Sequence, residues 1–185
     1  MTVTTLDPKT ALIVIDLQKG IVGFPTAHPM GGVLASATIL TAAFRRRGLP
    51  VVLVNVTGGA SGRSEHSFDL AGLPADWAGL VPKLDAKPND LLVTKKTWGA
   101  FTNTDLEARL KTLSVTQVVL AGVATSMGVE STARHAHELG FNVTLALDAM
   151  TDLSPEAHDN SVARIFPRLG ETGSAQGIVD LLDRA

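Results

Sequence analysis

The sequence predicts a single α/β domain with three layers, in which helices cover both faces of a doubly wound, six-stranded, mainly parallel sheet. Short apolar runs rich in β-branched residues recur along the chain without polar alternation, which is typical of strands buried on both faces. Helical patterns lie between these runs and indicate parallel strands joined by crossover helices. The chain has 185 residues, so we expect residues 1–185 to form one domain.

The expected strands follow one another at intervals that leave room for a helix. Five apolar runs are typical of buried strands, and a short sixth strand is expected near residues 171–174. The five runs are residues 11–15, 51–56, 91–94, 118–121 and 143–147.

The expected helices occupy residues 32–47, 105–113, 126–139, 154–169 and 177–184. The first is apolar along one face and is followed by Gly48, a residue type common just beyond a helix end. The fourth begins with Ser154 as a cap and Pro155 in its first turn. Residues 24–32 and 57–87 lack such a pattern, and the length of the second segment predicts a functional loop such as a lid.

Composition narrows the function classes. The net charge is −2 and no basic run exceeds residues 45–47, so nothing indicates a nucleic-acid partner. The absence of cysteine excludes disulfides and thiolate metal sites. We expect no metal or other cofactor, because His66 stands alone and His135 and His137 do not share a helix face. No signal-peptide pattern or apolar run of about 20 residues is present, so we expect a cytoplasmic protein without membrane contact.

Ligands of α/β sheets bind beyond the carboxyl ends of the strands, and three polar features lie there. Asp16 follows the first apolar run, where burial raises a carboxyl pKa and suits acid/base catalysis; a cap or a structural ion pair is the alternative. Lys95 and Lys96 follow the third run, and one of them could hold an anion or a nearby carboxylate; a solvated surface lysine is the alternative. The turn of residues 122–125 offers backbone amides for an anion, or is an ordinary connection.

Three segments resemble, in order, the motifs of the isochorismatase-like hydrolase superfamily, also called the cysteine hydrolase family. They are ALIVIDLQKGIV, TKKTWGAFTNTDLEARL and AGVATSMGVESTARHAHELGFNVTLALDAMTD. The family works with an Asp–Lys–Cys triad. Its aspartate matches Asp16, its lysine matches Lys95 (six residues before Phe101), and its cysteine position falls on Gly128. The resemblance also implies a cis peptide between Val123 and Ala124, and an oxyanion hole formed by the amides of Ala124 and Gly128.

Glycine cannot form the covalent intermediate of nucleophilic catalysis. The nearest hydroxyls, on Thr125 and Ser126, have no evident histidine base in the sequence. Resemblance to the isochorismatases, which also lack the cysteine, implies hydrolysis of an enol ether. Asp16 would then protonate the vinyl carbon, Lys95 would orient Asp16, and water would attack the resulting cation.

Four further residues are candidate substrate contacts. Arg63 could bind a substrate carboxylate, Phe24 and Trp98 could line an apolar pocket, and Thr125 lies in the turn; solvation or core packing is the alternative. The sequence leaves open a cysteine-free hydrolase with another small-molecule substrate, and a non-catalytic binding or partner protein on the same scaffold. The resemblance implies a homo-oligomer, a dimer or a tetramer, with a pocket completed by a neighbouring subunit.

Overall fold

The computed structural model describes residues 3–65 and 72–184. Its centre is a six-stranded sheet in which all described strands run parallel, in the order β3-β2-β1-β4-β5-β6. This strand order defines a doubly wound fold, so the predicted α/β class and its six strands are confirmed. The strands are β1 (Thr10–Ile15), β2 (Val51–Val56), β3 (Leu91–Lys95), β4 (Gln117–Val123), β5 (Asn142–Thr151) and β6 (Glu171–Gly173).

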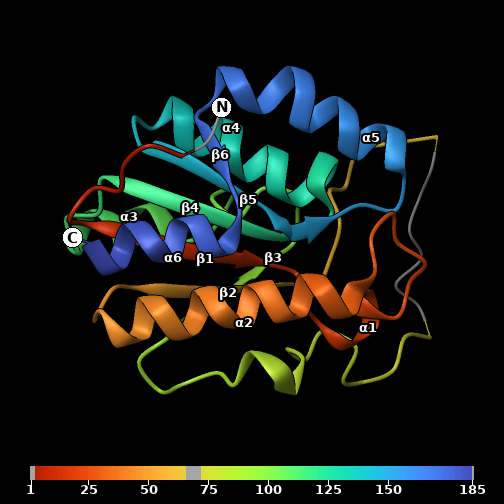
Figure 1. Cartoon of the computed structure of the whole chain (residues 1–185). Helices are drawn as coiled ribbons and strands as arrows, with labels where there is room; N and C mark the ends of the chain where they lie inside the picture. Colours follow the sequence, from red (N-terminus) through yellow and green to blue (C-terminus); the bar gives the residue numbers. More distant parts are fainter. Residues whose placement is uncertain (1–2, 66–71, 185) are drawn as a thin grey trace.

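Helices cover both faces of the sheet, and α2 and α4 lie on opposite sides of it (Figure 1). One apolar core joins the sheet to α2 (Met30–Arg46) and α6 (Ala175–Arg184). A second core joins the other face to α3 (Leu106–Thr112) and α4 (Glu130–Glu138). β1 contributes alternate side chains to the two cores, which explains why its sequence is apolar throughout. No described helix has the length and apolar character that crossing a membrane requires.

A glycine sets the spacing of the two central strands near their carboxyl ends. Gly122 of β4 lies opposite Ile15 of β1 and has a φ of 119°. A Cβ atom at this position would lie 2.0 Å from the carbonyl oxygen of Ile15, so no side chain fits there. The close approach places the turn after β4 beside Asp16, the residue that follows β1.

Two helices differ from the expected ones in type. The helix expected at residues 154–169 is an α-helix only over α5 (Pro155–Asn160), and it continues as a π-helical turn and a 3₁₀ turn around Pro167. Proline has no N–H for the helical ladder, which explains the change near its end. The helix expected at residues 126–139 begins with a π-helical turn, Thr125–Val129, before α4. The sequence alone does not separate π-helical from α-helical turns.

The fifth strand is also longer than expected. The apolar pattern predicted residues 143–147, whereas β5 continues to Thr151. The register between β4 and β5 shifts between Leu120 and Gly122, and Asp148 is exposed at this irregularity. A bulge therefore lets the strand continue past a charged residue that interrupts its apolar pattern. Two short helices were not predicted: α1 (Lys19–Val22) and a 3₁₀ turn, Pro82–Leu84.

The second half of the segment expected to form a lid is bonded to the scaffold. The amides of Lys19 and Gly20 donate to the carbonyls of Gly79 and Trp77, at 2.8 Å in both cases, and Val81 donates to Leu17. These bonds satisfy backbone groups that a free loop would leave to water. This part of the segment therefore forms a wall beside the end of β1. His66 lies outside the described residues.

Candidate active site

Asp16 leaves the end of β1 in an unusual backbone conformation. Its φ is 51°, in the left-handed region that non-glycine residues rarely adopt, and its amide donates to the carbonyl of Val54 at 2.9 Å. The residue is only 4% exposed. Such conformations persist where the surrounding structure enforces them, and they gather at functional sites.

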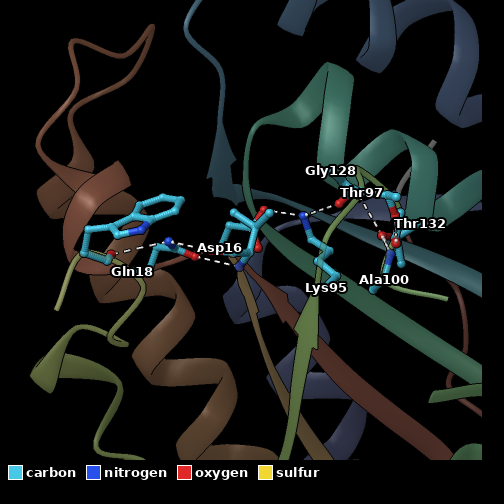
Figure 2. Close-up of polar contacts among 10 residues, drawn as sticks. Asp16, Gln18, Lys95, Thr97, Ala100, Gly128 and Thr132 are labelled. Atoms are coloured by element: carbon cyan, nitrogen blue, oxygen red, sulfur yellow. Dashed lines mark hydrogen bonds and ion pairs between the residues drawn. The ribbon is translucent and has the colours of Figure 1, made fainter. Parts of the chain in front are cut away.

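Lys95, the last residue of β3, reaches past the end of β2 to the Asp16 carboxylate. Its Nζ lies 2.6 Å from Oδ2 of Asp16 and donates also to the carbonyl of Thr97 at 3.1 Å, as Figure 2 shows. The Lys95 side chain is 2% exposed, whereas Lys96 is exposed to solvent. Of the two lysines that the sequence left as alternatives, the structure therefore pairs Lys95 with Asp16.

The environment of Asp16 favours its protonated form more than usual. Burial raises the pKa of Asp16 from 3.8 to about 6, and the charge and hydrogen bond of Lys95 offset only part of this effect. Oδ1 of Asp16 is buried and has no hydrogen-bond partner among the described residues. One carboxyl oxygen is thus held by Lys95, while the other has no described hydrogen-bond partner.

Gly128 faces this carboxylate. A Cβ atom built at Gly128 would lie 3.5 Å from Oδ2 of Asp16, so a side chain at this position would point at the Asp16–Lys95 pair. The same Cβ would lie 2.9 Å from Cγ2 of Ile15, which partly fills the space. The peptide bond between Val123 and Ala124 is cis, at the position that the resemblance implies. Gly128 is buried and Ala124 is half-buried, so their backbone lies at the edge of the same site.

A threonine ties the turn to the loop after β3. Oγ1 of Thr132 on α4 donates to the carbonyl of Gly128 at 2.6 Å and accepts from the amide of Ala100 at 3.0 Å (Figure 2). Thr132 is completely buried. The loops that follow β3 and β4 are therefore joined behind the site.

Gln18 was missed by sequence reasoning. Its Oε1 accepts from the amide of Val56 at 2.8 Å, and its Nε2 donates to the carbonyls of Val56 and Trp77. Gln18 is completely buried and ties the ends of β1 and β2 to the long segment. Its position two residues after Asp16 could have marked it as a candidate. The sequence does not show, however, which backbone groups the Gln18 side chain binds.

Asp152 was also missed, and the rule that selected Asp16 could have found it. It follows β5 directly, is 1% exposed, and its Oδ2 accepts from the amide of Ser126 at 2.6 Å. Its Oδ1 accepts from the amides of Leu153 and Ser154. Asp152 thereby holds the start of the turn that carries Gly128.

Thr125 has the histidine partner that the sequence did not reveal. Its Oγ1 lies 2.9 Å from Nδ1 of His158 on α5, and Thr125 is completely buried. Burial and the charge of neighbouring His28 lower the pKa of His158. The expectation that Thr125 lacks a histidine neighbour was therefore wrong, because 33 residues of chain separate the two.

The other predicted substrate contacts lie at the surface. Trp98 is 62% exposed, Phe24 is 40% exposed, and Arg63 is exposed. All three follow strands at the carboxyl edge of the sheet, and the side-chain hydrogen bonds and ion pair described for Asp16 and Lys95 involve other residues. Within the same described ranges, no three His, Asp or Glu side chains converge as metal ligands would.

Two surface hollows, of about 290 and 410 Å³, open at the opposite edge, where the amino ends of the strands lie. Neither is lined by a residue of the Asp16 site. Buried charge at the carboxyl edge, rather than the size of a hollow, therefore identifies the candidate site, in agreement with the rule for parallel sheets.

Fold and site together define a doubly wound α/β protein with a buried ion pair at the carboxyl edge of its sheet. The isochorismatase domain family matches residues 10–177, and the chain therefore belongs to the isochorismatase family of hydrolases. An isochorismatase family protein of Escherichia coli O157:H7, YecD, is 41% identical over 180 residues, covering 94% of this chain and 96% of YecD.

Two further proteins show the same relationship. The structure of an isochorismatase family protein from Burkholderia thailandensis is 38% identical, has a TM-score of 0.93, and covers 97% of this chain and 98% of its own. The ureidoacrylate amidohydrolase RutB of Methylobacterium radiotolerans is 31% identical over 195 residues, covering 86% of this chain and 74% of RutB. The family assignment made from the three sequence motifs is confirmed.

Proposed function

We propose that this isochorismatase-family hydrolase acts on a small molecule without a protein nucleophile, with Asp16 as general acid and base and Lys95 as its partner. One observation carries the proposal: the position that faces the Asp16 carboxylate is Gly128, which has no side chain. The Asp16 carboxyl group, with one oxygen not held by Lys95 and a raised pKa, serves as a proton donor instead.

The hydroxyls of the turn do not offer an evident replacement. Thr125 is completely buried and its Oγ1 contacts His158, on the side of α5. Ser126 is held through its amide by Asp152. A nucleophile must reach the reacting atom, and neither residue has a described contact with Asp16 or Lys95.

Hydrolysis of an enol ether suits these groups. Asp16 transfers a proton to the vinyl carbon, and the neighbouring ether carbon becomes a cation. Water adds to this carbon and returns a proton to the Asp16 carboxylate, after which the hemiketal breaks into a ketone and an alcohol. With a pKa of about 6, roughly a tenth of Asp16 is protonated at pH 7. Lys95 keeps Oδ2 in place, so Oδ1 is the oxygen that carries the proton.

The test is the release of pyruvate from isochorismate by the purified protein. We expect turnover, and we expect Asp16→Asn to reduce it by roughly 10²–10⁴-fold, the usual contribution of general acid catalysis. Asn keeps the size of the side chain and removes the transferable proton. Turnover that survives Asp16→Asn unchanged would remove Asp16 from the mechanism.

Two parallel measurements separate the alternatives. Hydrolysis of ureidoacrylate, the substrate class named for RutB, would contradict the proposal that the missing side chain excludes amide cleavage. Isochorismate that binds in calorimetry without being turned over would favour the non-catalytic binding protein. The proposal further includes a homo-oligomer, a dimer or a tetramer, supported by large apolar side chains exposed around the site.

A further inference from the structure

A second polar cluster lies at the carboxyl edge of the sheet, where the buried Thr125, Thr151 and His158 meet the exposed His28. It joins four parts of the chain: Thr125 in the turn, His158 on α5, His28 before α2, and Thr151 at the end of β5. Oγ1 of Thr125 lies 2.9 Å from Nδ1 of His158, and the rings of His158 and His28 are 4.5 Å apart between centroids. Thr151 accepts from the amide of His28 at 3.0 Å.

We propose that His158 is a positioning residue: as a neutral imidazole it holds Thr125, and with it the turn that carries Ala124 and Gly128, and its protonation releases that turn. The proposal rests on the proposed function only in taking this turn as part of the active site.

The turn depends on side-chain support. Residues Thr125–Val129 form a π-helical turn in which the carbonyl of Ala124 accepts from the amides of both Met127 and Val129. Single π-helical turns are rare and are associated with functional sites. Two side chains hold this one from the β5 and α5 side: Asp152 binds the amide of Ser126, and His158 contacts Thr125.

The surroundings of His158 oppose a positive charge. The residue is 7% exposed, and His28 is a second titratable ring against it. Burial is the largest cause that lowers the pKa of His158, and the charge of His28 adds to it, while Asp159 and Asp152 act in the opposite direction. A solvated histidine binds a proton more readily than the clamped one does, so acid shifts the equilibrium toward a conformation in which His158 has left the cluster.

Substitutions can separate the contact from the titration. His158→Asn places an amide near the position of Nδ1, keeps the contact with Thr125 and does not titrate. His158→Ala removes both properties. His28→Asn removes the neighbouring charge, so protonation of His158 should meet less opposition and open the turn less.

The experiment is hydrogen–deuterium exchange of residues 124–130 in the full chain, at about pH 5 and about pH 8, corrected for the intrinsic pH dependence of exchange. We expect the protection of these amides to fall severalfold at the lower pH in the wild type. Protection should stay constant with pH in His158→Asn, and His28→Asn should lose less than the wild type. Residues 10–15 of β1 report global unfolding, and the loss of protection at residues 124–130 should exceed any change there.

Two outcomes would overturn the proposal. One is an equal loss of protection at low pH in the wild type and in His158→Asn. The other is full protection in His158→Ala at about pH 8, where the clamp should be present in the wild type. If His158→Ala does not fold, the comparison of the wild type with His158→Asn still decides. No substrate is used, so a failure here is distinct from a failure of the proposed hydrolysis.

Discussion

At the scale of single residues, Asp16 and Gly128 define the site together. The left-handed backbone of Asp16 directs its carboxyl group beside Lys95, and Gly128 presents no side chain toward it. A buried ion pair contributes little stability because desolvation opposes the attraction of its charges. The incomplete bonding of Asp16, whose Oδ1 has no described partner, therefore fits a functional role better than a structural one.

Because its pKa is raised, Asp16 should make the free energy of unfolding depend on pH. The folded state binds this proton more tightly than the unfolded chain does, so the stabilising contribution is fully present below pH 3.8 and is lost as the pH rises through about 6. Between about pH 4 and about pH 7, the unfolding free energy of the wild type minus that of Asp16→Asn should fall by up to about 3 kcal/mol. Urea denaturation of both proteins measures this difference. A difference independent of pH would show that the pKa of Asp16 is not raised.

The close packing at Gly128 should make the fold sensitive to an added side chain. Gly128→Ala should destabilise the fold by about 1–3 kcal/mol, because its Cβ would overlap Cγ2 of Ile15, which is completely buried and has little room to move. Gly31→Ala on α2 is the matched control, since no atom lies within 4 Å of its added Cβ. Gly31 is the second residue of α2, so the control should change stability by less than about 1 kcal/mol. Equal thermal shifts in the two variants would contradict the close packing of Gly128 against Ile15.

At the scale of elements, the turn after β4 depends on a carboxylate from the end of β5. The Asp152 carboxylate accepts hydrogen bonds from three backbone N–H groups. Asp152→Asn replaces one of its oxygens by an NH₂ group, which cannot accept, so at least one of these N–H groups loses its partner. We expect a loss of about 1–3 kcal/mol, the usual consequence of an unsatisfied buried polar group. Asp183→Asn, at an exposed ion pair with Arg46, should change stability by less than about 1 kcal/mol. Thermal unfolding of both variants tests the contrast, and equal losses would count against the support by Asp152.

Regular elements were predictable from periodicity, and their irregular ends were not. The uninterrupted apolar run of β1 indicated a strand buried on both faces, and the structure buries every residue of it. The second half of β5 was not predicted because Asp148 interrupts the apolar pattern. Asp148 lies at a bulge, which becomes visible only in the pairing of β5 with β4. The contact between Thr125 and His158 is likewise a product of topology, because no periodic signal relates residues 33 positions apart.

At the scale of the whole molecule, the strand order brings the residues of the candidate site together at one edge. β1 and β4 lie adjacent at the centre of the sheet, so the segments that follow them meet although 107 residues separate Ile15 from Gly122. Gln18 and Thr132 then tie neighbouring loops to one another behind the site. A sequence rule that places function at the carboxyl ends of strands selects this edge, but it does not give the distances between the loops, which depend on the folded chain.

The same edge of the sheet exposes apolar side chains through which copies of the chain could associate. Segments that follow four different strands expose Phe24, Trp98, Met127 and Leu153, and Trp98 is 62% exposed. Large apolar side chains gathered around one edge are typical of an interaction surface. We expect sedimentation velocity to show a mass of two or four chains, and Trp98→Asp to reduce it to one. Leu113→Asp is the control, because Leu113 is 43% exposed at the end of α3, toward the amino edge of the sheet. A wild-type monomer would contradict the oligomer, and an unchanged mass for Trp98→Asp would exclude Trp98 from the surface that forms it.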